Sequence, residues 1–144
     1  MPISFSTAGL NAEDFAAKPR VSEPCFARVR VAEEKVKEGK QLLVLEVVEA
    51  TVSGQIGCVH PEFVSLPTGA SVDTDRQLCR RLGRFALAFG LATLDDIAAG
   101  QVDIDFADAV GRDVVVEFLR RPQGVQVSFL GVWAADDPAA PVVN

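Results

Sequence analysis

Polar and apolar residues alternate strictly in the stretch CFARVRV, residues 25–31. One face of this stretch carries small and branched side chains: Ala27, Val29 and Val31. The opposite face carries an aromatic ring and two cations: Phe26, Arg28 and Arg30. A period of two predicts a half-buried strand. The charged stretch AEEKVKEGK and the leucine- and valine-rich run QLLVLEVVEATV come next, so the pattern predicts a hairpin of two strands.

A third strand and a helix are predicted in the middle of the chain. QIGCVH has strand character, and we expect Pro61 to close it because proline cannot donate a ladder hydrogen bond. In the segment TDRQLCRRLGRFALAFGL, apolar residues recur at helical spacing: Leu78, Leu82, Phe85 and Phe89. Asp73 or Thr74 is expected to cap this helix, and Gly90 to end it in a left-handed conformation.

Two more strands are predicted near the C-terminus, RDVVVEFL and VQVSFLGVW, joined by the turn RRPQG. One more helical turn fits the stretch that precedes them, TLDDIAAG. Three strands, a helix and two strands are the element order of the OB-fold, so we predict a mainly β (α+β) protein, a five-stranded OB-fold barrel with one helix between strands 3 and 4. A β-sandwich would need about seven strands, and a βαβ fold would place helices between successive strands.

The barrel is expected to occupy residues 25–133. Residues 1–24 lack any period and are predicted to be an N-terminal arm, and residues 134–144 a flexible acidic tail. The N-terminus has neither a basic start nor a long apolar run, so we expect a cytoplasmic protein with no membrane span. Three cysteines without CxxC spacing fit reduced thiols.

The stretch CVHPEF holds the only histidine of the chain. His60 and Glu62 match the H-x-E half of a zinc deaminase signature, but the P-C-x-x-C half is absent. A Cys58 nucleophile with a His60 base would lack an Asn or Asp placed to orient the imidazole ring. We therefore expect a strand end followed by a turn, and a protein that is no enzyme and holds no metal or cofactor.

Charge is distributed unevenly along the chain. The net charge of −6 argues against a nucleic-acid partner, because phosphate binding requires lysine and arginine. Between Asp95 and Asp113, however, there are six aspartates and one arginine. Cations gather elsewhere, in an arginine group and a lysine group: Arg76, Arg80, Arg81 and Arg84, and Lys35, Lys37 and Lys40. The net charge therefore averages over an acidic region and basic regions of the chain.

The fold places several of these cations beside one predicted groove. In an OB-fold, oligonucleotides cross strands 2 and 3 between the strand 1–2 and strand 4–5 loops. Lysines fall in the first loop and arginines in the second: Lys35, Lys37 and Lys40, and Arg120 and Arg121. Phe26, Arg28 and Arg30 would add a stacking ring and phosphate-binding charge on strand 1. Alternatively these are solvated loop charges, with the lysines neutralised by nearby glutamates: Glu33, Glu34 and Glu38.

Six aromatic residues of the predicted barrel fall into two groups. Four have the parity of core residues and are expected to pack the barrel: Phe85, Phe89, Phe118 and Phe129. Phe63 and Trp133 lie at strand ends, so we expect them to be free to stack on bases.

Three stretches of the chain resemble a known family: CFARVRVAEEKVKEGKQLLVLEVVEATVSGQIGCVHPEF, RQLCRRLGRFALAFGL and AVGRDVVVEFLRRPQGVQVSFLGVW. The resemblance is to phage-encoded OB-fold proteins, long classed as a domain of unknown function, that accompany recombination and replication genes and bind single-stranded DNA. It covers roughly residues 25–133 and implies a sequence-tolerant single-stranded-DNA-binding protein acting in phage or prophage recombination or replication, in the host cytoplasm.

Two further expectations accompany this resemblance. The acidic tail is similar to those by which some single-strand binders recruit recombination or replication proteins, and homo-oligomers are compatible with such a role. The alternative function is an OB-type protein-interaction module that recruits a recombinase or nuclease, as the acidic balance allows.

Overall fold

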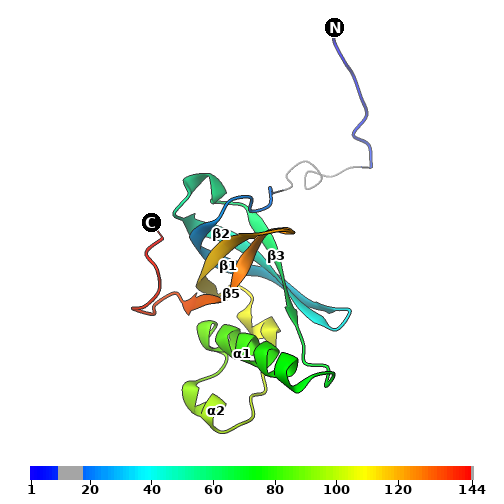
Figure 1. The fold of residues 1–144 in the computed structure, drawn as a ribbon. Helices are drawn as coiled ribbons and strands as arrows, with labels where there is room; N and C mark the ends of the chain where they lie inside the picture. The colour runs from blue at the N-terminus through cyan, green and yellow to red at the C-terminus, as the bar shows by residue number, and fades with distance from the viewer. Residues whose placement is uncertain (10–17, 144) are drawn as a thin grey trace.

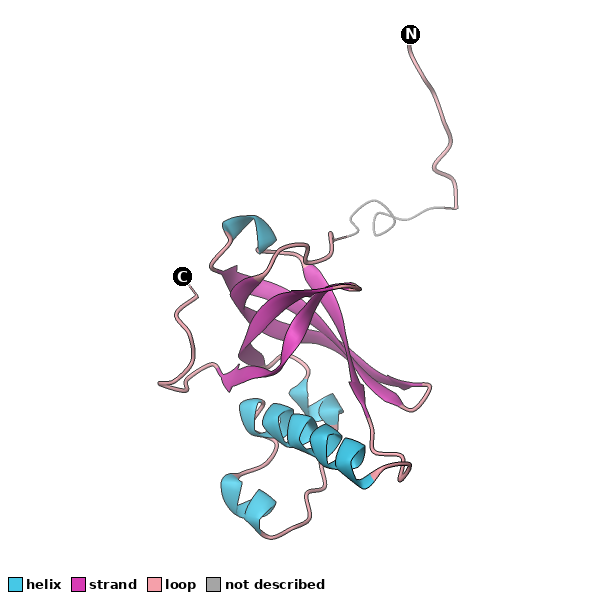
Figure 2. Ribbon diagram, in the orientation of Figure 1, coloured by secondary structure: helices cyan, strands magenta, loops and turns pink. Residues whose placement is uncertain are grey.

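A computed structural model of the chain describes residues 1–9 and 18–143. Residues 10–17 of the expected N-terminal arm and Asn144 of the expected tail lie outside the described residues. The described residues are mainly β, as predicted, with a five-stranded antiparallel sheet, and the two α-helices lie below it in the view of Figures 1 and 2. None of the described helices is long and apolar enough to cross a membrane.

The sheet contains β1 (Cys25–Lys37), β2 (Lys40–Ala50), β3 (Val59–Ser65), β4 (Asp113–Arg121) and β5 (Gly124–Ala134). Their order is β3-β2-β1-β4-β5, and every neighbouring pair is antiparallel. In the described residues β3 and β5 are the two end strands and exchange no backbone hydrogen bonds with each other.

The hairpin of β1 and β2 is longer than predicted, because β1 continues to Lys37. Its turn consists of Glu38 (φ 54°) and Gly39 (φ 75°). Two consecutive positive φ angles are those of a type I′ turn, which suits the twist of a two-residue hairpin. The three lysines predicted in a loop are therefore strand residues: Lys35, Lys37 and Lys40.

The third strand begins later in the chain than the sequence pattern predicted. Residues Ser53–Gln55 form a 3₁₀ turn, and β3 begins only at Val59. Pro61 does not end the strand but lies inside it, opposite Val44 of β2. This is compatible with a sheet edge, where the missing N–H of proline breaks no ladder bond on the free side.

Between β3 and β4 the chain forms α1 (Val72–Ala88), α2 (Leu94–Ala98) and a 3₁₀ turn, Phe106–Ala109. The expectation of one helix is therefore incomplete. The hydroxyl of Ser71, and not Asp73 or Thr74, caps α1. Gly90 has a φ of 71° and follows the helix, as predicted.

The core lies between the inner face of the sheet and α1. Inward-facing residues of β1 and β2 are buried as the alternation predicts: Ala27, Val29, Val31, Leu43, Leu45 and Val47. Three of the four predicted core rings, Phe85, Phe89 and Phe118, are buried as well. The prediction was wrong for Phe129, which is 37% exposed.

A large bulge in β5 explains the exposure of Phe129. Val116 pairs with Val132 and Phe118 with Val127, so the single residue Glu117 faces residues 128–131. Such an insertion bends the strand and leaves its backbone groups unpaired in the ladder. A Cβ on Gly131 would lie 2.8 Å from Cβ of Ser128 and 3.0 Å from Cβ of Glu117. Only glycine therefore fits the end of the bulge.

Replacing Gly131 with alanine should lower the free energy of unfolding by about 1–3 kcal/mol, the usual effect of overpacking. Urea denaturation of the purified variant measures the change. Gly54→Ala is the matched control, because nothing lies within 4 Å of a Cβ there and the substitution should be nearly neutral. Equal stability of the two variants would contradict the close approach at the bulge.

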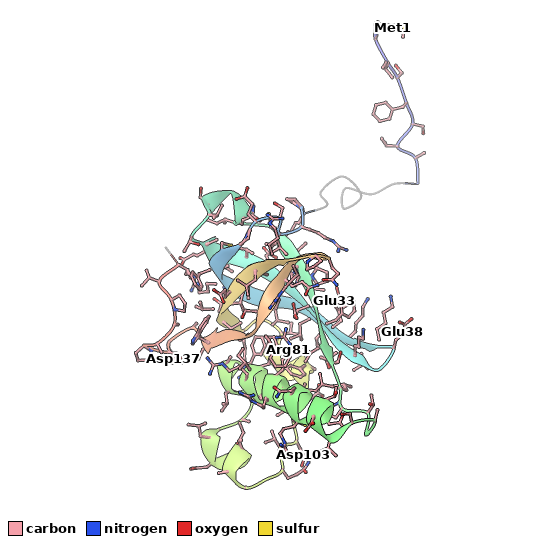
Figure 3. All side chains as sticks on the ribbon, in the orientation of Figure 1. Met1, Glu33, Glu38, Arg81, Asp103 and Asp137 are labelled. Atoms are coloured by element: carbon pink, nitrogen blue, oxygen red, sulfur yellow. The ribbon has the colours of Figure 1, made fainter. Side chains whose placement is uncertain are left out.

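The termini also contact the sheet. The N–H of Val21 donates a hydrogen bond to the carbonyl of Val59 (3.0 Å), and the N–H of Val59 donates one to the carbonyl of Pro19 (2.9 Å). This short parallel pairing extends the free side of β3 at its first residue. At the other end of the chain Val143 is buried. Residues 1–9 lead away from the sheet, with Met1 at the far end (Figure 3).

Candidate nucleic-acid interface

The CVHPEF stretch supplies the centre of a buried polar network. His60 and Glu62 both point to the inner side of β3, and Nε2 of His60 lies 2.7 Å from a carboxylate oxygen of Glu62. The other carboxylate oxygen accepts from the guanidinium of Arg81 on α1. All three residues are buried, and the His60 ring packs edge-on against Phe118 at 5.3 Å. The expectation of a strand end at His60 is therefore wrong, because the two side chains lie within β3.

Arg81 also binds β5. One terminal nitrogen donates to the carbonyl of Ser128 (3.3 Å) and of Phe129 (2.6 Å), which belong to the bulge. We call the group of Glu62, Arg81, Ser128 and Phe129 the β3–β5 junction. Figure 3 shows Arg81 between α1 and the sheet. The junction connects the two end strands of the sheet through one guanidinium.

Cys58 and His60 of this stretch have separate partners, and Cys25 is a second buried thiol. The sulfur of Cys58 lies 3.9 Å from the carbonyl of Gly54, and the imidazole of His60 binds Glu62 instead of a thiol. Burial raises the pKa of the Cys25 thiol, which disfavours its thiolate. In residues 1–9 and 18–143 no group of three or more His, Cys, Asp or Glu is placed to hold a metal ion.

The outer face of the β1–β2 hairpin and β3 brings several of the predicted binding residues together. Lys35 of β1 lies opposite Leu42 of β2, which lies opposite Phe63 of β3. In the next row Lys37 lies opposite Lys40, and Lys40 opposite Ser65. Opposed residues of antiparallel strands share a face. We call these two rows the basic face; its ring, Phe63, is 46% exposed.

Glutamates beside the hairpin do not neutralise these lysines in the described residues. No ion pair there involves Lys35, Lys37 or Lys40. Glu34 instead accepts a hydrogen bond from the side chain of Gln41 (2.8 Å) on the other face of the hairpin. Glu38 lies at the hairpin tip, and Glu33 lies farther along β1 (Figure 3). The lysine side chains are therefore available to a ligand.

Arg120 and Arg121 lie at the far end of β1 from the lysines. Cys25, the first residue of β1, lies opposite Phe118, so the end of β4 extends beyond it. Both arginines are exposed, and Arg120 donates to the carbonyl of Ser22 (3.2 Å). Because Val21 pairs with the start of β3, this contact places the β4–β5 turn near that end of β3.

Phe26, Arg28 and Arg30 are less available than the sequence suggests. Arg30 binds Asp113 with Nε at 2.8 Å, and this ion pair raises the pKa of Arg30. Arg28 lies 3.3 Å from Glu49 and 3.5 Å from Asp113. Phe26 is half-buried. Carboxylates thus already occupy both guanidinium groups on the outer side of β1.

Trp133 lies away from the basic face. It is half-buried at the end of β5, opposite Val115, in a hollow of about 260 Å³ that also contacts α1. The guanidinium of Arg84 lies 5.9 Å from its ring. In Figure 1 this end of β5 is on the left of the molecule, whereas the hairpin and β3 are on the right. The structure does not bring Trp133 together with Phe63.

The sequence did not predict the roles of three residues of this region: Glu62, Arg81 and Phe129. A signal existed for Arg81, since it lies three residues after Leu78 and four before Phe85 and so falls on the apolar stripe of α1. A second signal was that His60 and Glu62 have the same strand parity as the apolar Val64, which the structure shows in the core. The bulge that exposes Phe129 left no comparable pattern.

Comparison of the chain with family models, with curated proteins and with solved structures found no significant match. The functional inference therefore rests on the placement and chemistry of its own residues.

Proposed function

We propose that this protein is a non-enzymatic, sequence-tolerant single-stranded-DNA-binding protein of OB-like architecture, acting in phage or prophage recombination or replication. The strand order β3-β2-β1-β4-β5 supports an OB-like architecture. Arg81 of α1 bridges the two end strands, because it binds the Glu62 carboxylate of β3 and the backbone carbonyls of Ser128 and Phe129 in β5.

The basic face is the observation that carries the proposal. Two rows across three strands combine three lysines free of ion pairs among the described residues with one exposed phenyl ring. Lysines hold the phosphates and a ring stacks on a base, which needs no particular sequence. Stacking requires an unpaired base, so a single strand fits this face better than a duplex.

A binding measurement with labelled oligothymidylate and a matched duplex tests the proposal. If four of the five available cations contact phosphates, log K should fall with log salt with a slope of about −3, since each contact on a single strand contributes about −0.7. The cations meant are Lys35, Lys37, Lys40, Arg120 and Arg121. Fluorescence polarisation over a salt series gives both affinity and slope. A protein that binds neither nucleic acid at low salt would favour the protein-interaction module instead.

A further inference from the structure

Phe129 presents an exposed ring on a rigid support. Cζ of Arg81 lies 5.1 Å from the centre of the Phe129 ring and 5.1 Å from the centre of the buried Phe85 ring. The same guanidinium holds the backbone of the bulge at Ser128 and Phe129, and Nε of Arg84 donates to the carbonyl of Leu130 (3.2 Å). The ring is thus supported from behind by a buried cation and carried by a backbone segment with three hydrogen bonds to α1.

The β3–β5 junction also relates Phe129 to Phe63. Glu62 and the carbonyl of Phe129 bind the same guanidinium, so β3 and β5 approach each other at these residues. Phe63 directly follows Glu62, and strand alternation turns its ring to the outer face. The exposed residues Phe63 and Phe129 therefore lie on the two strands that Arg81 connects.

We propose that Phe129 is a second base-stacking residue, which takes an unpaired nucleobase of the same strand that Phe63 contacts. This inference rests on the proposed function. A cation on the inner side of the ring leaves the outer side for a base, and a ring held in place loses little conformational entropy on binding. Arg81 acts here as a positioning residue that does not touch the nucleic acid.

Tryptophan fluorescence tests base stacking at this position directly. Trp133 is the only tryptophan, so Trp133→Phe gives a silent background, whose binding is checked first by polarisation. One reporter at a time is then introduced into this background: Phe129→Trp, Phe63→Trp or Leu94→Trp. The last is a control on α2, because the side chain of Leu94 is 72% exposed. A stacked base quenches indole emission, so oligothymidylate should quench the first two reporters and leave the third unchanged.

The outcomes separate the two proposals. Quenching of the Phe63 reporter without quenching of the Phe129 reporter would overturn the role of Phe129 and leave the proposed function standing. Failure of the wild-type protein to bind oligothymidylate would overturn both. As an independent measurement, Phe129→Leu keeps apolar bulk but removes the ring, and should weaken binding about fivefold or more, the usual effect of losing one stacked base. An unchanged affinity would also overturn the inference.

Discussion

Arg81→Met should lower the free energy of unfolding by about 3–5 kcal/mol, the usual effect of removing one partner of a buried ion pair. Methionine fills similar space on α1 but leaves the Glu62 carboxylate buried without its cation. It also leaves the carbonyls of Ser128 and Phe129 without the donor that they share. Urea denaturation followed by circular dichroism measures the loss.

Two further variants identify the cause of that loss. Arg80→Met changes the neighbouring residue of the same helix, which is exposed, and should shift stability by no more than about 0.5 kcal/mol. Adding Glu62→Leu to Arg81→Met removes the stranded charge, so the double variant should be more stable than Arg81→Met alone. A double variant no more stable than Arg81→Met would show that the arginine acts through its packing and not through its charge.

The alternation in β1 predicted its inner face correctly but not the position of its lysines. Strict continuation from Val29 and Val31 would turn Lys35 and Lys37 inward. The structure has a register shift between Val31 and Glu33, after which these lysines share the face of the exposed Phe63. A bulge changes the face of every later residue, and it depends on pairing with a second strand. Local periodicity therefore could not reveal it.

Other parts of the site depended on contacts distant in sequence. Position 62 lies in a strand and position 81 in a helix, so neither local pattern indicated that the two charges would neutralise each other. Pro61 suggested a strand end, because a central strand would not accept it; the edge position of β3 removes that restriction. The order of the elements, in contrast, followed from short-range patterns alone, and these predicted the strands and α1.

Reversing Lys37 and Lys40 to glutamate should weaken single-strand binding about 25-fold at 0.1 M salt. In the counterion-release description each lost phosphate contact removes about 0.7 log units of affinity at that salt concentration, and two contacts are lost. The salt slope should flatten from about −3 to about −1.5 for the same reason. Both residues are exposed on the tip of the hairpin, away from the core, so folding should be unaffected.

The matched control reverses Arg76 and Arg80 on the exposed side of α1, which changes the net charge by the same amount. If binding depended on total charge, the two double variants would be equally weak. If the strand crosses the basic face, the α1 variant should keep most of its affinity and its salt slope. Reversal of Arg120 and Arg121 then locates the other end of the path, because these cations lie near the start of β3 while the lysines lie near its end. Loss of binding in the α1 variant, with affinity retained in the hairpin variant, would place the strand across α1 and remove the basic face from the site.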